Sequence, residues 1–201
     1  MRLIRDYQFV DPKDKGASVA IGNFDGVHLG HQSVIDLARD GAARHSAPLG
    51  ILTFEPHPRS YFAPDAAPFR LMDAHARETR LAKLGIERLY QLNFNASLAA
   101  LTPREFAQLV IVDGLGLVNV VVGADFCFGK GRAGTAADLI AFGKEMGFDV
   151  TIAPLIEDAS IQISATAIRN ALSDVRLRDA AAQLGHWHRI EGRVIGGEQR
   201  G

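Results

Sequence analysis

Two histidines and three glycines follow a short apolar run near the start of the chain. The ten residues "GNFDGVHLGH" occupy positions 22–31 and place His28 and His31 three residues apart. Residues at this spacing at the start of a helix share one face, so both imidazoles can address one ligand. The free N–H groups of a helix start favour an anion, and glycine lets phosphate approach the backbone. The stretch therefore predicts a phosphate site.

A second group of polar residues lies in "ISATAIR", residues 163–169. Ser164 and Thr166 stand at the start of a short predicted helix, and Arg169 follows one turn later. Hydroxyl and N–H groups there can bind phosphate oxygens, and a guanidinium can fork onto two of them. The alternative is that Ser164 or Thr166 is an ordinary helix N-cap. The residues alone leave both interpretations open.

The elements that carry these groups are predicted from hydrophobic periodicity. Strands are expected at 17–21, 49–54, 88–92, 118–122 and 150–155. Helices are expected at 31–45, 73–84, 102–112, 135–147, 166–173 and 175–184, the third of them starting with a capping box from Thr102 to Glu105. This alternation predicts an α/β fold, a Rossmann-like open parallel sheet of about five strands flanked by helices.

Four polar, glycine-containing loops follow the ends of predicted strands. They are "GNFDGVHLGH", "TFEPHPRSYF" from Thr53, "GADFCFGKGRAG" from Gly123 and "ISATAIR". In an open parallel sheet the ligand binds beyond the carboxyl ends of the strands, so these loops are expected to meet at one site.

Composition excludes several classes of protein. The chain has 201 residues, 47% of them hydrophobic, which suits one main domain. A net charge of -1 provides no overall basic field for a nucleic acid, and the single cysteine, Cys127, excludes an intramolecular disulfide. No apolar run reaches the ~20 residues of a membrane span, and the N-terminus lacks a signal-peptide core. We expect a soluble, cytoplasmic protein with a small phosphorylated ligand and with neither nucleic acid nor membrane as partner.

The combined motifs resemble a known family. HxGH in "GNFDGVHLGH" is similar to the HxGH nucleotidyltransferase superfamily, and "TFEPHP" with "DFCFGKGRAG" looks like the adenylyltransferase module of bacterial bifunctional FAD synthetases. The resemblance implies an ATP site lined by Gly22, Asn23, Phe24, Asp25, Gly26, His28, Gly30 and His31, with a second phosphate clamp of Ser164, Thr166 and Arg169. It also implies that Phe54, Pro56, His57, Pro58, Asp125, Phe126 and Phe128 lie near the flavin or the adenosine.

Several of these residues have a plainer interpretation. The loop that carries Phe54, His57, Tyr61 and Phe62 can form an aromatic wall for an isoalloxazine ring. The alternative is that these aromatic residues belong to the core, which suits Phe54, the end of a strand, better than the others. The loop from Gly123 suits either a mobile flap that contacts anions or an ordinary solvated loop. Cys127 is expected to be a packing residue.

The sequence also departs from the family pattern in the last motif. Ala165 replaces a serine, and Ala167 stands where flavin enzymes often carry another arginine. These two changes predict weaker phosphate binding.

The resemblance implies transfer of AMP from ATP to FMN, which gives FAD and pyrophosphate. The phosphate of FMN is largely a dianion at neutral pH and needs no general base. His28, His31, Arg169 and Mg²⁺ held mainly by substrate phosphates would stabilise the developing charge. Two alternatives stay open: another HxGH nucleotidyltransferase with a different phosphorylated acceptor, and a weakly active nucleotide- or flavin-binding module.

The C-terminal residues are expected to differ from the rest. We predict an adenylyltransferase domain over 1–185, followed over 186–201 by the start of a riboflavin kinase-like barrel or a tail. The alternation in 190–195 predicts a strand without a partner in this chain, and His186 and His188 are expected on the strand surface. Such a protein would make FAD from FMN but not FMN from riboflavin. The sequence does not indicate an oligomeric state.

Overall fold

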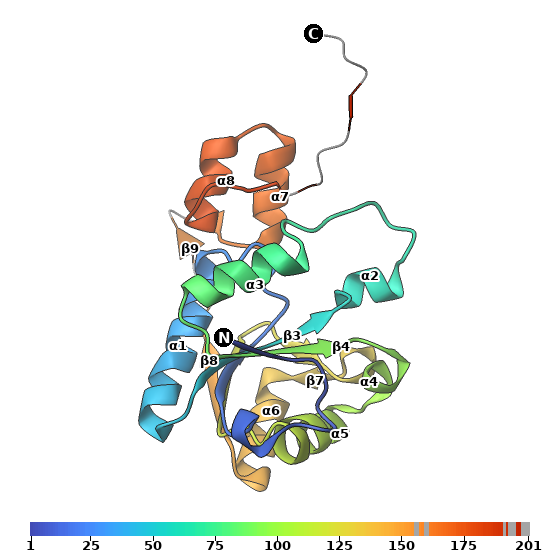
Figure 1. Ribbon diagram of the computed structural model, residues 1–201, viewed down its shortest axis with the longest axis vertical. Coiled ribbons are helices and arrows are strands. Elements are labelled where there is room, and N and C mark those ends of the chain that lie inside the picture. Colours follow the sequence, from blue (N-terminus) through green and yellow to red (C-terminus); the bar gives the residue numbers. More distant parts are fainter. Residues whose placement is uncertain (155–156, 159–160, 191, 193–195, 198–201) are drawn as a thin grey trace.

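A six-stranded parallel sheet forms the centre of the molecule (Figure 1). The computed structural model describes residues 1–154, 157–158, 161–190, 192 and 196–197. The strand order is β1-β4-β3-β2-β5-β8, and every neighbouring pair is parallel. The bounds are β1 Arg2–Ile4, β2 Ser18–Ile21, β3 Leu49–Glu55, β4 Arg88–Asn93, β5 Asn119–Gly123 and β8 Asp149–Ala153. The predicted α/β fold is confirmed.

Five of these strands match the predicted runs to within about two residues, because each contains several aliphatic, β-branched or aromatic side chains. Leu155, the predicted end of the last strand, lies outside the described residues. The sixth strand, β1, was missed. It has three residues and, in the described part of the chain, lies at the edge of the sheet beside β4, so it is too short for a period-two pattern to show in its sequence.

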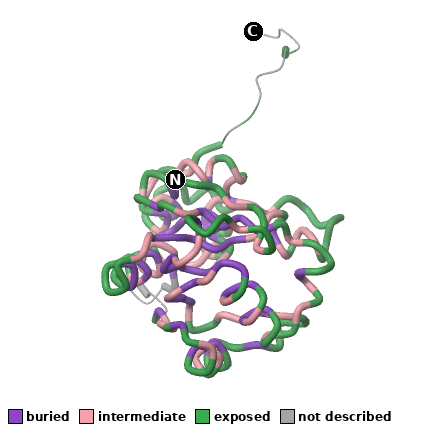
Figure 2. The backbone as a smooth tube through the Cα atoms, turned by 60° about the horizontal axis from the view of Figure 1, so that its bottom comes forward, coloured by how far each residue is buried: buried purple, intermediate pink, exposed green. Residues whose placement is uncertain are grey.

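Helices cover both faces of the sheet. On one face α1 (Leu29–His45) and α3 (Ala74–Lys83) pack against inward side chains such as Ala20 and Ile51. On the other, α4 (Ala96–Ala100), α6 (Ala136–Met146) and the π-helix η2 (Phe106–Gly114) pack against a second cluster. Figure 2 shows the buried backbone running through the middle of this arrangement. The strands alternate between the two clusters, as period-two side chains require.

The helix predicted over 102–112 is partly a different element. Its start is confirmed: Thr102 and Glu105 form the expected capping box at the head of α5 (Pro103–Glu105). From Phe106 the chain continues as η2, which has a wider turn than an α-helix. Toward its end Gly114 packs so closely that an added Cβ would lie 2.5 Å from the carbonyl oxygen of Tyr7.

Several short elements were not predicted. They are η1 (Pro12–Asp14), α2 (Pro58–Phe62), η3 (Lys130–Arg132), the hairpin of β6 (Cys127–Phe128) with β7 (Gly134–Thr135), and β9 (Glu157–Asp158) with β10 (Ile161–Gln162). In the β6–β7 hairpin the Lys130 N–H donates to the Leu101 carbonyl at 2.7 Å, and Gly129 packs against Pro103. The loop from Gly123 is thus tied to the start of α5.

Two C-terminal helices, α7 (Ala165–Ser173) and α8 (Leu177–Leu184), confirm the predicted pair and form an antiparallel unit at the edge of the domain (Figure 1). They share a small apolar cluster with Leu71, which comes from the loop before α3. Because the backbone N–H of Leu71 also donates to Asp25 at 2.8 Å, Leu71 links α7 to the loop that follows β2. In the part of the chain that the structure describes, no helix is both long and apolar enough to cross a bilayer.

Candidate active site

The loops that carry the motifs lie at the topological switch point of the sheet. β2 is flanked by β3 and β5, so the chain leaves β2 toward one side and returns to its other side for β5. At such a point the loops after two adjacent strands diverge and leave a crevice. The segments 22–28 and 124–126 follow β2 and β5 directly. This arrangement places the first and third motifs together, with "TFEPHP" after the neighbouring β3.

The two histidines meet at the start of α1. His28 is the N-cap, and its Nδ1 accepts a hydrogen bond from the His31 backbone N–H at 3.3 Å. The two imidazoles stack with their centroids 3.6 Å apart. A Cβ on Gly30 would lie 3.2 Å from the His28 ring, so a larger residue there would press on this pair. Asp25, three residues before this N-cap, does not cap the helix.

Burial keeps both imidazoles neutral at pH 7. His28 is 6% exposed, and desolvation lowers its pKa to about 4 although the charge of Asp25 acts in the opposite direction. Burial, followed by the charge of His28, also lowers the pKa of His31 well below the ordinary value. Since Nδ1 of His28 accepts a hydrogen bond, its proton lies on Nε2 and is available to an acceptor.

The backbone between β2 and α1 is held in an uncommon shape. Phe24 and Val27 have φ values of +51° and +42°, and Gly26 between them has +85°. The left-handed region is unfavourable for a bulky or β-branched residue unless the surroundings enforce it. Both side chains are almost fully buried, and the Phe24 ring lies 5.1 Å from the ring of His31. Phe24 was expected to line the ATP site; its side chain packs in the core and supports the loop.

Asp25 connects three segments. Its Oδ1 accepts from the backbone N–H of Leu71 at 2.8 Å and of Met72 at 3.4 Å, and its Oδ2 pairs with Nη2 of Arg169 at 2.8 Å. Nε of Arg169 donates to the Phe69 carbonyl at 2.6 Å. The side chain of Asp25 is 4% exposed and that of Arg169 24%. The first and last motifs are therefore joined by a largely buried ion pair.

The N-cap interpretation of Ser164 is confirmed, because its hydroxyl accepts from the Ala167 N–H at 3.1 Å at the start of α7. Thr166 lies on the exposed side of the same turn. Their binding of phosphate stays a prediction.

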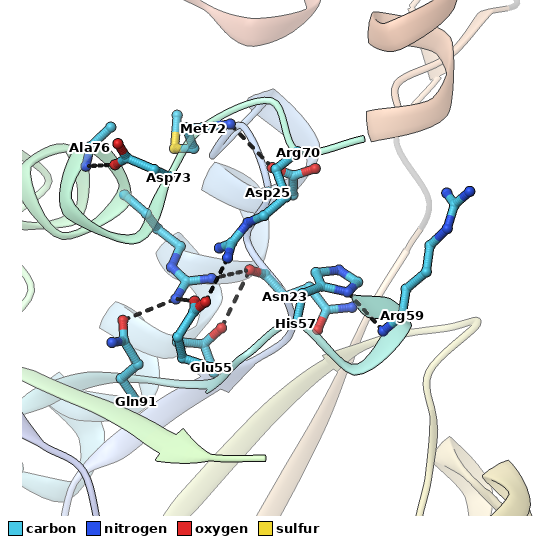
Figure 3. Close-up of polar contacts among 12 residues, drawn as sticks. Asn23, Asp25, Glu55, His57, Arg59, Arg70, Met72, Asp73, Ala76 and Gln91 are labelled. Carbon is cyan, nitrogen blue, oxygen red and sulfur yellow. Dashed lines mark hydrogen bonds and ion pairs between the residues drawn. The ribbon is translucent and has the colours of Figure 1, made fainter. Parts of the chain in front are cut away.

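The end of β3 carries a second charged cluster (Figure 3). Glu55 accepts from Nη1 of Arg70 at 2.7 Å and from Nη2 of Arg77 at 3.0 Å. His57 is 8% exposed and caps α2 by accepting from the Arg59 N–H at 3.0 Å. Desolvation lowers the pKa of His57 to about 4. Pro56 and Pro58, on either side of His57, fix the direction of this loop.

Aromatic side chains lie beside this cluster. Phe94 contacts the rings of Phe54, Tyr61 and Phe62 edge-on, with centroid distances of 5.8, 5.2 and 5.8 Å. Phe54 is partly buried against the core, as expected, whereas Phe62 is 69% exposed. Tyr61 and Phe62 therefore form an aromatic cluster with Phe94, a residue that the sequence did not indicate, whereas the ring of His57 packs on Phe69. Contact of this cluster with a flavin stays a prediction.

Comparisons with known proteins identify the family. A family model described as FAD synthetase matches residues 10–167. The chain belongs to the FAD synthetase family. It is 38% identical over 199 residues to the bifunctional riboflavin kinase/FMN adenylyltransferase of Pseudomonas fluorescens and 36% identical over 202 residues to that of Escherichia coli K12. These alignments cover 99% and 100% of this chain, and 64% of each relative.

A solved structure from Streptococcus pneumoniae, described as a macrolide-efflux protein, shares the fold. It is 30% identical, with a TM-score of 0.79, and the match covers 92% of this chain and 61% of that one. The efflux role in that description is said of the Streptococcus pneumoniae protein and is not transferred to this chain. The likeness supports the sheet order and helix placement seen in this member of the FAD synthetase family.

The third motif of this FAD synthetase family chain divides into core and surface residues. Phe128 is buried against Phe106, with ring centroids 5.7 Å apart, and stacks on Phe126 at 5.5 Å. Asp125 is exposed at the switch point. Cys127 is half-buried and free.

His186 and His188 were expected on a strand surface, and that expectation is wrong. Residues 187–190 have no regular secondary structure, while residues 191 and 193–195 of the predicted strand lie outside the described residues. Nε2 of His186 lies 3.2 Å from the Gly26 carbonyl, and Nε2 of His188 lies 3.1 Å from the Leu71 carbonyl. The alternation of polar and apolar residues in this segment suggested a strand. In the structure, the two histidine side chains instead contact backbone carbonyls of distant loops. The segment after α8 thus contacts the loop that holds the FAD synthetase family motif.

The buried histidines predict a pH dependence of stability. His28 and His57 have folded pKa values of about 4 and unfolded values near 6.5, so the unfolded chain binds more protons between these limits. Their contribution is fully present above pH 6.5 and is lost as the pH falls toward 4, on the order of 2 kcal/mol for each histidine. Urea unfolding at pH 7 and pH 4.5 measures the loss. The variant His28→Asn/His57→Asn keeps an N-cap acceptor at both positions and should show a smaller loss; an equal loss would contradict the assignment.

Proposed function

We propose that this chain transfers AMP from ATP to FMN and releases FAD and pyrophosphate. The observation that carries the proposal is the stacked pair His28 and His31 at the N-terminus of α1, beside Arg169, in a member of the FAD synthetase family. The wall formed by Tyr61 and Phe62 lies after the adjacent strand and suits a flavin ring.

The reaction makes one phosphorus–oxygen bond and breaks another. An oxygen of the FMN phosphate attacks the α-phosphorus of ATP, and the bond to the leaving pyrophosphate breaks. Because that phosphate is already largely a dianion, the protein need not remove a proton. Its task is to align the two phosphates and to stabilise charge on the α-phosphoryl oxygens. The N–H of His28 and the free N–H groups of the first turn of α1 suit this task.

Arg169 is positioned before any ligand arrives. The carboxylate of Asp25 and the carbonyl of Phe69 hold its Nη2 and Nε atoms, which fixes the plane of the guanidinium. A fixed guanidinium spends less conformational entropy when it binds phosphate. We assign it to the phosphates of ATP.

Mg²⁺ would enter with ATP and supply positive charge to the phosphates. Asp25 already accepts from three donors, so it cannot serve as a cation ligand without losing its pair with Arg169. The donor set suits a magnesium ion held chiefly by substrate oxygens. Asp125, exposed at the switch point, is a candidate for a protein oxygen.

The proposed functional unit is residues 1–185, with ATP and FMN as substrates and the cytoplasm as location. The chain spans about 64% of the length of the curated relatives, so their kinase activity is not assigned to it. A weakly active binding module is the second candidate, favoured by Ala165 and Ala167 in the last motif. Turnover distinguishes the two.

The test is incubation of the protein with ATP, Mg²⁺ and FMN, followed by chromatography of the flavins. We expect FAD and an equal amount of pyrophosphate. Nicotinamide mononucleotide and phosphopantetheine, offered in place of FMN, test other phosphorylated acceptors. Adenylylation of either one in preference to FMN would contradict the proposed substrate, and binding of FMN without FAD would favour the second candidate.

Replacement of Arg169 predicts a specific kinetic defect. Arg169→Ala should raise KM for ATP more than KM for FMN, because a charge-assisted phosphate contact is worth roughly 1.5 to 3 kcal/mol. Steady-state kinetics with each substrate varied in turn measure both constants. The matched control is Arg176→Ala, an exposed arginine paired with Asp174 and Asp179 in the turn before α8. An unchanged KM for ATP would remove Arg169 from the ATP site.

A further inference from the structure

Arg77 lies at the centre of the charged cluster and has no exposed surface. It comes from α3, a helix that carries none of the sequence motifs. Burial of a guanidinium is costly unless partners surround it, and desolvation accordingly lowers the pKa of Arg77. A side chain with no accessible surface cannot contact a substrate. Its effect on the site must pass through the groups that it binds.

The guanidinium of Arg77 joins three neighbouring strands near their carboxyl ends. Nη1 donates to the carbonyl oxygen of Asn23 at 3.2 Å, beyond β2. Nη2 donates to Oε2 of Glu55 at 3.0 Å, at the end of β3, and to Oε1 of Gln91 at 2.9 Å, on β4. Figure 3 shows these acceptors gathered around one point. A planar group with several fixed donors thus connects the loop of the ATP motif to the loop of the flavin motif.

Two of these three acceptors, the Asn23 carbonyl and the Glu55 carboxylate, lie next to the loops of the candidate site. The Asn23 carbonyl also accepts from Thr53 Oγ1 at 3.3 Å, and it directly precedes the backbone that turns left-handed at Phe24. Glu55 is two residues before His57, the N-cap of α2. The other oxygen of Glu55 pairs with Arg70, so the carboxylate is held from two directions.

We infer that Arg77 is a positioning residue that sets the distance between the ATP-motif loop and the flavin-motif loop. The inference rests on the proposed function, in which alignment of two phosphates carries most of the catalysis. A misplacement of about 1 Å by a remote substitution can lower a rate by about 10²-fold. Loss of Arg77 therefore affects the alignment of the two bound substrates more than the affinity for either one.

This role has a signature that a merely structural role lacks. If Arg77 only stabilised the fold, its replacement would weaken binding of ATP and of FMN together with stability. A positioning residue leaves the dissociation constant for each substrate alone close to that of the wild type and lowers kcat. A fall in kcat without a rise in either dissociation constant therefore identifies a positioning role, and a rise in both constants identifies a structural one.

The experiment uses the full chain and the variant Arg77→Lys. Lysine keeps the positive charge but cannot hold three acceptors in one plane. We expect kcat for FAD formation to fall about 10- to 100-fold, with little change in the calorimetric Kd for ATP-Mg²⁺ alone or in the Kd for FMN alone from flavin fluorescence. The matched control is Lys83→Met, which removes an exposed charge from the same helix and should match the wild type. Wild-type kcat in Arg77→Lys, or a loss explained by weaker Kd values, would overturn the inference.

Two further measurements keep the test decisive. Should Arg77→Lys fail to fold, the variant Arg77→Met removes the buried charge and leaves Glu55 paired with Arg70, so no carboxylate is left uncompensated; the same comparison of kcat with Kd applies. Hydrogen exchange of the unliganded protein gives a readout without turnover. Arg77→Lys should exchange faster in both 22–28 and 54–60, and unchanged exchange there would overturn the inference. Absence of FAD formation by the wild type, with faster exchange in both loops, would reject the proposed function and support the positioning role.

Discussion

Replacement of His28 by asparagine is expected to lower kcat for FAD formation by about 10²- to 10³-fold, the usual effect of removing one donor from a site that stabilises developing negative charge. Asparagine is chosen because His28 is also the N-cap of α1. An asparagine oxygen can accept the same backbone hydrogen bond, whereas alanine would add a capping loss of about 1 kcal/mol. The kinetic effect is then separated from the effect on the helix.

His31→Asn and His28→Asn should also be non-additive. The two rings stack at 3.6 Å and one caps the residue that carries the other, so the first replacement already disrupts the pair. Single-turnover rates of both variants and of the double variant measure the coupling. The control is His75→Asn, an exposed histidine on α3. Near-normal FAD formation by both single variants would exclude the pair from the chemistry.

Asp25→Ala is expected to produce the largest loss of stability, about 3 to 5 kcal/mol, because it leaves a half-buried guanidinium and two backbone N–H groups without their acceptor. For a chain of this length the loss corresponds to a decrease in Tm of roughly 6 to 20 °C. Asp25→Asn retains an acceptor for Leu71 and should lose less.

The charge pair can be tested separately from the hydrogen bonds. In the variant Asp25→Asn/Arg169→Met neither charge remains. Its loss of unfolding free energy should therefore be smaller than the sum of the losses in the two single variants. Urea unfolding of the wild type and the three variants completes the cycle. A Tm for Asp25→Ala equal to that of the wild type would show that the carboxylate contributes nothing to the fold.

The sequence predicted what depends on local pattern. Runs of apolar residues located five strands, and the first three motifs fell at the sheet edge because each directly follows such a run. The capping box at Thr102 was visible because all its atoms come from four consecutive residues. In contrast, the partner of Asp25 lies 144 positions away, and no local rule predicts such a pair.

The remaining site residues were missed for a similar reason. Arg77 stands in a helix rich in charged residues and was indistinguishable from a solvated face, although its spacing of four from the buried Leu81 was a signal. Phe69, against which His57 packs edge-on at 4.9 Å, lies in an irregular loop without periodicity. Its place depends on tertiary contacts with α7.

The left-handed residues Phe24 and Val27 have a consequence for which core substitutions this chain can tolerate. The shape of the loop is maintained by two side chains in the same apolar cluster as α1 and α3. A conservative substitution elsewhere in that cluster, such as Leu89 or Ile51, relaxes the cluster and with it the support of the loop. Substitutions in the interior facing α1 and α3 are therefore expected to change the motif loop as well as the stability of the fold, and variants that stabilise this interior by repacking can still lose the proposed activity.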